Sequence, residues 1–187
     1  MSCPSAGNCA AGGFYRGRGF VVSERDGVWG RVIEVPGLRA LGANAYVSSV
    51  SCASPGNCVA GGNHGWPYAW GFVVSEKHGV WGRAINVPGL VALTDGRTAD
   101  VLSISCARAG NCAAGGNYED MAHGGSQGFV AVERNGIWGR AIEMPGLGAL
   151  NKGGGAAVFS VSCAPPGNCA AGGFYGDSPQ HFEGFVS

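Results

Sequence analysis

Cys52-Ala-Ser-Pro-Gly-Asn-Cys58-Val-Ala-Gly-Gly62 is the stretch that decides the fold. Its pattern is two cysteines around five residues, followed by small residues that end in Gly-Gly, and it occurs four times, starting at Cys3, Cys52, Cys106 and Cys163. Successive copies therefore start 49, 54 and 57 residues apart. Self-similarity at this period is typical of repeat proteins. We therefore predict an array of like units and expect function where the units differ.

Every cysteine belongs to one of these pairs. A five-residue segment ending in Gly-Asn can reverse the chain so that its two cysteines face each other, which predicts four local disulfides and an oxidising compartment. The bridges we expect are Cys3–Cys9, Cys52–Cys58, Cys106–Cys112 and Cys163–Cys169. Zinc is the alternative, but structural zinc pairs are usually closer in sequence, and the four His occupy no repeated position. We expect no metal and no cofactor.

Four strand candidates recur in each unit. In the second unit they are residues 45–51, 57–62, 71–76 and 81–87. Period-2 alternation and β-branched residues support three of them, and no segment indicates a helix. The cysteine hairpin joins the first two strands, and a short turn such as Arg25-Asp26-Gly27 joins the last two. The Gly-Gly pairs precede loops, so we interpret them as turn glycines and not as a phosphate cradle.

Four antiparallel strands in about 50 residues is the pattern of a β-propeller blade. We predict an all-β, propeller-like array of four four-stranded antiparallel repeats, with incomplete first and last units, in a single domain of residues 1–187. The repeats would span residues 1–44, 45–98, 99–155 and 156–187. A threefold β-trefoil-like or β-prism-like fold is the alternative. Open strand edges are templates for pairing, so we also expect a homo-oligomer.

The turn between the last two strands carries a family resemblance. Ser23-Glu24-Arg25-Asp26-Gly27-Val28-Trp29 and the matching segment from Ser75 to Trp81 resemble the Asp-box hairpin of BNR-type propellers, which include sialidases and sortilin-like and photosystem-assembly propellers. Arg25 and Lys77 stand where that family has Asp. The Ser-Val-Ser-Cys and Asn-Cys-x-Ala-Gly-Gly segments also look like repeats of secreted bacterial propellers. The resemblance implies a propeller in which this hairpin is structural and lies away from the ligand face.

Composition and the terminal sequence restrict the classes of partner and the location that we expect. Twelve Lys and Arg balance twelve Asp and Glu, so no net charge attracts nucleic acid. No apolar run approaches the roughly 20 residues of a transmembrane helix, so we expect no membrane insertion. The sequence starts at Met1-Ser2-Cys3, which lacks the features of a signal peptide. We expect a mature fragment of a secreted or cell-surface protein.

The candidate ligand-binding residues lie between the second and third strands of each unit. These segments vary while their flanks stay constant, and all are rich in aromatic residues; binding residues gather on such loops, and Tyr and Trp give contact area at low entropic cost. The alternative is that they only cap the sheets. The candidates are Tyr15, Arg16, Arg18, His64, Trp66, Tyr68, Trp70, Tyr118, His123, Tyr175 and His181.

A second aromatic set recurs at one position of each unit. Trp29, Trp81 and Trp138 each precede an Arg by two residues, which suits sugar stacking, but a residue repeated in every unit is more often packed between units. We favour packing for this set.

These observations favour a non-catalytic, secreted, lectin-like module that binds a glycan or another neutral surface ligand. Nucleophile motifs, phosphate loops and paired loop carboxylates are absent, so we do not expect an enzyme, and a glycosidase-like activity is the least favoured interpretation. The main alternative is a structural module that forms rings or filaments through its open strand edges.

Overall fold

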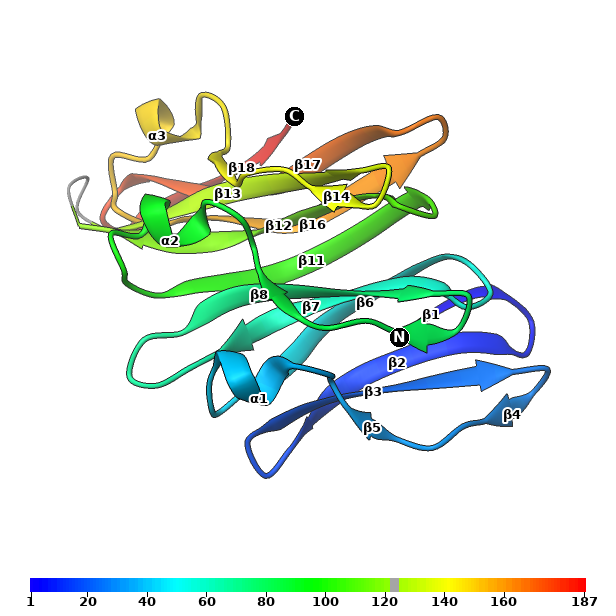
Figure 1. Ribbon diagram of the computed structural model, residues 1–187. Helices are drawn as coiled ribbons and strands as arrows, with labels where there is room; N and C mark the ends of the chain where they lie inside the picture. The colour runs from blue at the N-terminus through cyan, green and yellow to red at the C-terminus, as the bar shows by residue number, and fades with distance from the viewer. Residues whose placement is uncertain (122–124) are drawn as a thin grey trace.

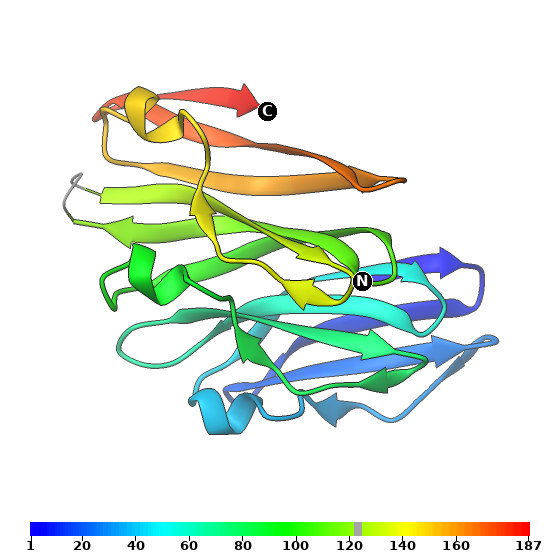
Figure 2. The ribbon, with the colours of Figure 1, turned by 45° about the horizontal axis from the view of Figure 1, so that its top comes forward.

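The computed structural model describes residues 1–121 and 125–187. Four antiparallel sheets follow one another along the chain and stack as successive layers (Figures 1 and 2). The protein is thus an all-β repeat array of four propeller-like sheets. The chain does not form the threefold alternative, a β-trefoil or β-prism, because the strands of each unit pair only within their own sheet and that sheet packs face to face on the next one.

Each sheet is an up-and-down meander. The first contains β1 (Ser2–Ser5), β2 (Asn8–Tyr15), β3 (Arg18–Arg25), β4 (Val28–Trp29) and β5 (Ile33–Glu34). The second contains β6 (Tyr46–Ser54), β7 (Asn57–His64), β8 (Trp70–Lys77), β9 (Val80–Trp81) and β10 (Ile85–Asn86). The third contains β11 (Ala99–Arg108), β12 (Asn111–Asp120), β13 (Gly125–Arg134), β14 (Ile137–Trp138) and β15 (Ile142–Glu143). The fourth contains β16 (Ala156–Ala164), β17 (Asn168–Ser178) and β18 (His181–Val186).

The first and last units are incomplete, as predicted. β1 has four residues, whereas its counterpart β6 has nine. The fourth sheet has three strands among the described residues, β16, β17 and β18. The two ends of the stack therefore differ from its interior.

The predicted fourth strand of each unit is broken into two pieces. In the first sheet β4 and β5 both pair with β3, and the register moves by one residue between the pairs Glu24–Trp29 and Phe20–Glu34. Gly30 lies at this step, and its N–H donates to the carbonyl oxygen of Ser23 at 2.9 Å. The extra residue is a bulge, which periodicity alone does not show.

Three one-turn helices, not expected from the sequence, follow the Pro-Gly-Leu segments. They are α1 (Leu38–Leu41), α2 (Leu90–Leu93) and α3 (Leu147–Leu150). Each begins after a glycine in the left-handed region, for example Gly37 with φ 78°. The first leucine of each helix is buried, so a single turn places one apolar side chain over the sheets. Four residues are too few to show helical periodicity. No helix in the described part of the chain has the length and apolar character needed to cross a bilayer.

Local disulfides join the cysteines of every hairpin, which confirms the predicted pairing. Within β6 and β7, Cys52 and Cys58 are directly opposite each other, with a Cα–Cα distance of 3.9 Å. The other three bridges have the same spacing of six residues, and no cysteine is free. Four such bridges indicate an oxidising environment.

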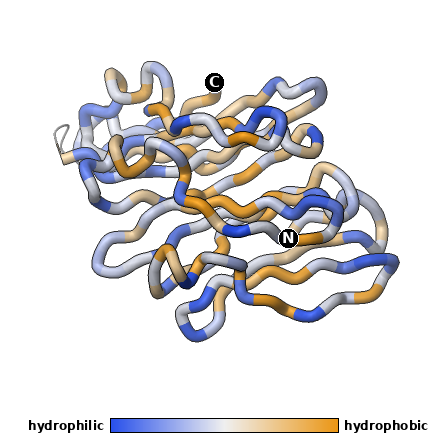
Figure 3. The backbone as a smooth tube through the Cα atoms, viewed as in Figure 1, coloured by the Kyte–Doolittle hydropathy of each residue, from blue (hydrophilic) through white to orange (hydrophobic). Residues whose placement is uncertain are grey.

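Apolar residues between the sheets form the core. Each sheet places the first strand of the next unit against its face: β6 packs on β2, β11 on β6 and β7, and β16 on β11 and β12. Figure 3 shows apolar segments along the strands and hydrophilic residues at many of the turns. The same positions fill each junction: Val21, Phe72 and Trp81 belong to the cluster between the first two sheets, and Val73, Phe129 and Trp138 to the next one.

The Gly-Gly pairs lie inside strands and not in turns, which corrects our interpretation. In β7, a Cβ on Gly61 would come within 2.9 Å of the Val101 side chain of the next sheet, and one on Gly62 would overlap the carbonyl oxygen of Tyr46. Only glycine permits both approaches. The motif is therefore needed for packing within and between units.

Serines of the first strands join neighbouring sheets. The Oγ of Ser2 accepts from the N–H of Cys52 at 3.0 Å, and the Oγ of Ser51 does the same for Cys106. Ser105 repeats the contact with Cys163 at 2.9 Å. Since the first strand lies at the edge of its sheet, these serines satisfy backbone donors that no strand pairs. This explains the Ser-Val-Ser-Cys pattern.

A second set of side-chain hydrogen bonds joins neighbouring sheets near their outer strands. Ser23 donates to Glu76 at 2.8 Å and accepts from the indole Nε1 of Trp81 at 3.2 Å. Trp81 and Trp138 are 9% and 8% exposed, so the repeated tryptophans of the second and third units pack between units as predicted. In the next junction the buried Glu133 accepts from Ser75, and desolvation raises its pKa.

Candidate functional site

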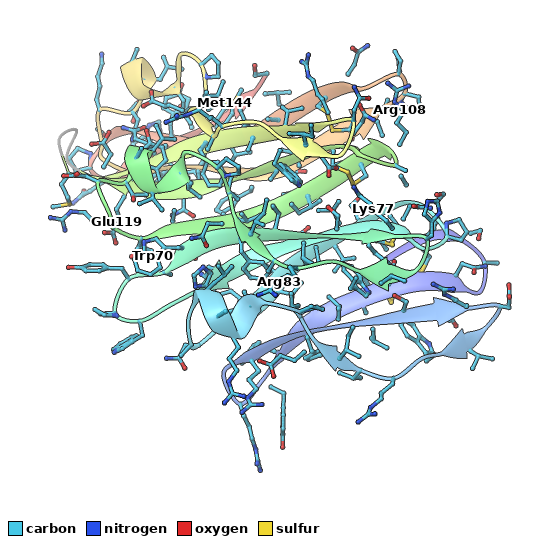
Figure 4. The ribbon with its side chains drawn as sticks, in the orientation of Figure 1. Trp70, Lys77, Arg83, Arg108, Glu119 and Met144 are labelled. Atoms are coloured by element: carbon cyan, nitrogen blue, oxygen red, sulfur yellow. A yellow bond between two sulfur atoms is a disulfide. The ribbon has the colours of Figure 1, made fainter. Side chains whose placement is uncertain are left out.

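One side of the molecule, at one end of the strands, carries the candidate loops that the structure describes. We call this side the loop end: it contains the β2–β3, β7–β8 and β17–β18 connections, the end of β12, the start of β13 and the three helices (Figure 2). The cysteine hairpins lie at the opposite end, the cysteine end, where Gly79 N–H donates to the Gly56 carbonyl oxygen at 2.8 Å. In Figure 4, Trp70 and Lys77 mark these two ends of β8. The predicted residues from different repeats thus share one side of the protein.

Three of the predicted aromatic residues are exposed to solvent. Trp66 is 81% exposed, Tyr15 65% and Tyr68 45%. A single exposed aromatic is ordinary on a protein surface, but here two lie in one short loop and a third lies on a turn at the same end. These side chains are available for contact with a ligand.

Two other candidates are buried and cannot contact a ligand directly in this geometry. His64 is 0% exposed, with its Nε2 2.6 Å from the Asn86 side-chain oxygen, and desolvation lowers its pKa. Tyr118 is 2% exposed and donates to Glu143 at 2.9 Å; burial, more than this bond, raises its pKa. His64 is the last residue of β7 and Tyr118 lies near the end of β12, so both close the core at the loop end of their sheets. Sequence position alone does not distinguish the two roles.

The β7–β8 loop, residues 65–69, is held at both of its ends. Gly65 donates to the Ala43 carbonyl oxygen at 2.7 Å, and the Ala69 carbonyl oxygen accepts from Ala99 at 2.8 Å. Gly65 has φ 115°, a conformation that favours glycine, and the Trp66–Pro67 peptide is cis. Backbone contacts to the units before and after it therefore position the loop that presents Trp66.

Trp70 and His64 form the base of this loop. Their rings are 5.9 Å apart in an edge-to-face arrangement, and Trp70 is half-buried. The indole nitrogen of Trp70 is buried without a partner among the described residues. We assign Trp70 a supporting position at the base of the loop.

A groove of 210 Å³ adjoins the loop on the side of the first unit. The β2–β3 turn and the segment after α1 form it, and its polar lining residues are Arg16, Arg18, Glu34, Arg39 and Asn44. Arg18 and Glu34 are 3.3 Å apart, and the Arg16 guanidinium lies 5.1 Å from the centre of the Tyr15 ring. Ala43, which accepts the bond from Gly65, also lines the groove. The groove and the Trp66 loop are therefore neighbours.

Arg39 and Asn44 were not among the predicted site residues. They belong to the segment between the last strand of one unit and the first strand of the next, which looks like a plain connection in the sequence. A usable signal was present, because this segment also varies between repeats while the Pro-Gly-Leu before it is constant.

The β17–β18 hairpin carries an exposed ionic cluster. His181 Nδ1 lies 2.9 Å from an Asp177 oxygen, and its Nε2 lies 3.8 Å from Glu183. The bond to Asp177 raises the pKa of His181. These three side chains have a spacing that a metal ion could use, but all are exposed and they already pair with one another. Tyr175, on β17, is half-buried against the last core cluster. His123 lies outside the described residues.

A polar cluster near the starts of β6 and β11 links two units. Asn63, 3% exposed, donates to Tyr46 at 2.7 Å and to Asp100. Desolvation is the main cause, and Glu119 a further one, of the raised pKa of Asp100. Asn63 thus bonds to Tyr46 on β6 and to Asp100 on β11, so we interpret this cluster as a structural link between the second and third sheets.

No protein-family model matches this chain, and no curated protein matches it significantly in sequence.

Proposed function

We propose that this protein is a secreted, non-catalytic binding module whose loop end recognises a glycan or another neutral surface ligand. The observation that carries the proposal is the Trp66 side chain, 81% exposed on a loop whose backbone is fixed at both ends. A large aromatic face exposed to solvent is suited to stacking on the CH face of a pyranose ring. Indole also contributes contact area at a low entropic cost.

The surrounding polar groups suit sugar hydroxyls. Arg16, Arg39 and Asn44 line the adjoining groove, and Tyr68 adds a phenol on the same loop as Trp66. Arg18 is paired with Glu34, so part of the groove's positive charge is compensated. Directional donors beside an exposed ring give orientation to a ligand that stacking alone would leave free to rotate.

A glycan array tests the proposal. We expect the wild-type protein to bind a restricted set of glycans, and Trp66→Ala to weaken the best of them about 30-fold, the ~2 kcal/mol of a hot-spot aromatic. Ile137→Ala is the matched control, since Ile137 is 74% exposed at the cysteine end and its substitution should leave binding unchanged. No bound glycan, or equal loss in both variants, would refute the proposal. Release of chromophore from chromogenic glycosides would refute its non-catalytic part.

A further inference from the structure

The outer face of the first sheet has the residues that pack between sheets at the internal junctions, but no preceding sheet covers them in this structure. Trp29 is 45% exposed there, whereas its equivalents Trp81 and Trp138 are 9% and 8% exposed, each covered by the preceding sheet. Phe20 is partly exposed, and its equivalent Phe72 is 0% exposed. We call this surface, with Phe20, Val22 and Trp29, the first face.

The outer face of the last sheet is the other half. Val186 is 86% exposed, although its equivalents Val21 and Val73 are 0% and 1% exposed beneath the sheet that follows them. Ser162 is exposed as well, while its equivalent Ser105 accepts from the N–H of Cys163. We call this surface, with Ser160, Ser162 and Val186, the last face.

The two faces carry the two sides of one contact that the chain makes at its internal junctions. Inside the protein, Val21 shares a cluster with Phe72 and Trp81, and Ser2 accepts from Cys52 N–H. The first face offers Phe20, Trp29 and the N–H of Cys3 in place of those partners. A surface whose complement is already built into the same chain fits a second copy of that chain.

We propose that the last face of one molecule docks on the first face of a second copy, continuing the stack. Ser162 of one chain accepts from the Cys3 N–H of the other, and Val186 packs against Phe20 and Trp29. The contact is head-to-tail, so each molecule still has one unused face after a single docking event. Figure 2 shows the first and last sheets at opposite ends of the stack. This proposal uses sheet faces, not the strand edges suggested by the sequence, and is independent of glycan binding.

Ring size sets the number of copies. Each chain supplies four sheets. Propellers typically close with about four to eight blades. One chain does not close on itself, because Trp29 on the first face and Val186 on the last face are both exposed. Two copies reach the upper limit of about eight blades, and three exceed it. We therefore assign a two-chain ring in which both contacts are head-to-tail and no face remains open.

Light scattering coupled to size-exclusion chromatography tests the assignment. At about 100 µM, a hundredfold above a micromolar dissociation constant, we expect twice the 18.9 kDa of one chain. Val186→Lys and Trp29→Lys should each give monomers, because each blocks one face. Both positions are exposed, and near-ultraviolet circular dichroism verifies that the variants fold. Ile137→Lys is the control: the equivalent Val28 and Val80 are 70% and 71% exposed whatever lies beside them, so the dimer should persist.

Mixing the two monomeric variants separates head-to-tail docking from other contacts. The Val186→Lys chain retains an intact first face and the Trp29→Lys chain an intact last face, so an equimolar mixture should recover one contact and a two-chain species. A symmetric face-to-face dimer would instead be lost in only one variant and would not be restored by mixing. A monomeric wild-type protein, a dimer unaffected by both substitutions, or a ladder of longer assemblies would overturn the two-chain ring.

Discussion

Trp81→Ala tests whether the junctions between sheets hold this protein together. Trp81 is 9% exposed, sits in the cluster between the first two sheets and donates its indole N–H to Ser23. A buried Trp side chain removes about 200 Å² from water, and at about 25 cal/mol per Å² this sets an upper value of about 5 kcal/mol. Core Trp→Ala substitutions typically cost about 3–5 kcal/mol, so we expect a loss of about 4 kcal/mol.

Urea unfolding followed by far-ultraviolet circular dichroism measures this loss. For a slope of about 2.5 kcal/mol per M, the midpoint should fall by about 1.6 M urea. Trp66→Ala is the matched control, because the same side chain is removed from a site that is 81% exposed, and its effect should stay within about 0.5 kcal/mol. Equal losses in the two variants would refute the view that stacking of repeats, and not the loops, supplies the stability.

Two further predictions concern the hairpins and the pH response. Replacing Cys163 and Cys169 together with Ser should cost only about 2 kcal/mol in urea unfolding, since the bridge closes a short loop; complete unfolding of the variant would contradict a purely local role. The pKa of His64 is lowered in the folded protein, so on acidification the unfolded chain takes up the proton first. The stabilising contribution of His64 is therefore present above its ordinary pKa of 6.5 and is lost as the pH falls through the lower folded pKa. His64→Gln should therefore flatten the decline in stability between neutral and acidic pH. His181→Ala should not flatten it, because Asp177 raises the pKa of His181 and the contribution of that residue is lost as the pH rises, which is the opposite direction. Identical profiles for wild type and His64→Gln would contradict the assignment.

Covalent and local features followed from the sequence. Five residues ending in Gly-Asn can reverse the chain, so the pairing of Cys52 with Cys58 could be predicted from the spacing and the turn residues, with zinc as the alternative. The strand alternation and the repeated turns likewise fixed the meander of each unit, since both are short-range effects of side-chain direction and turn geometry.

Relations between units required the tertiary structure. The need for glycine at Gly61 and Gly62 comes from atoms of another strand or another sheet, which no local pattern contains. The exposure of Trp66 and the burial of His64 differ for the same reason: both lie in one aromatic segment, and only the packing of neighbouring sheets decides which is covered. The sequence by itself therefore determined the strands of each unit and the disulfide of its hairpin, because both depend on contacts within a few residues. Three-dimensional stacking decided which copies of each repeated residue are buried, because burial depends on whether a neighbouring sheet is present.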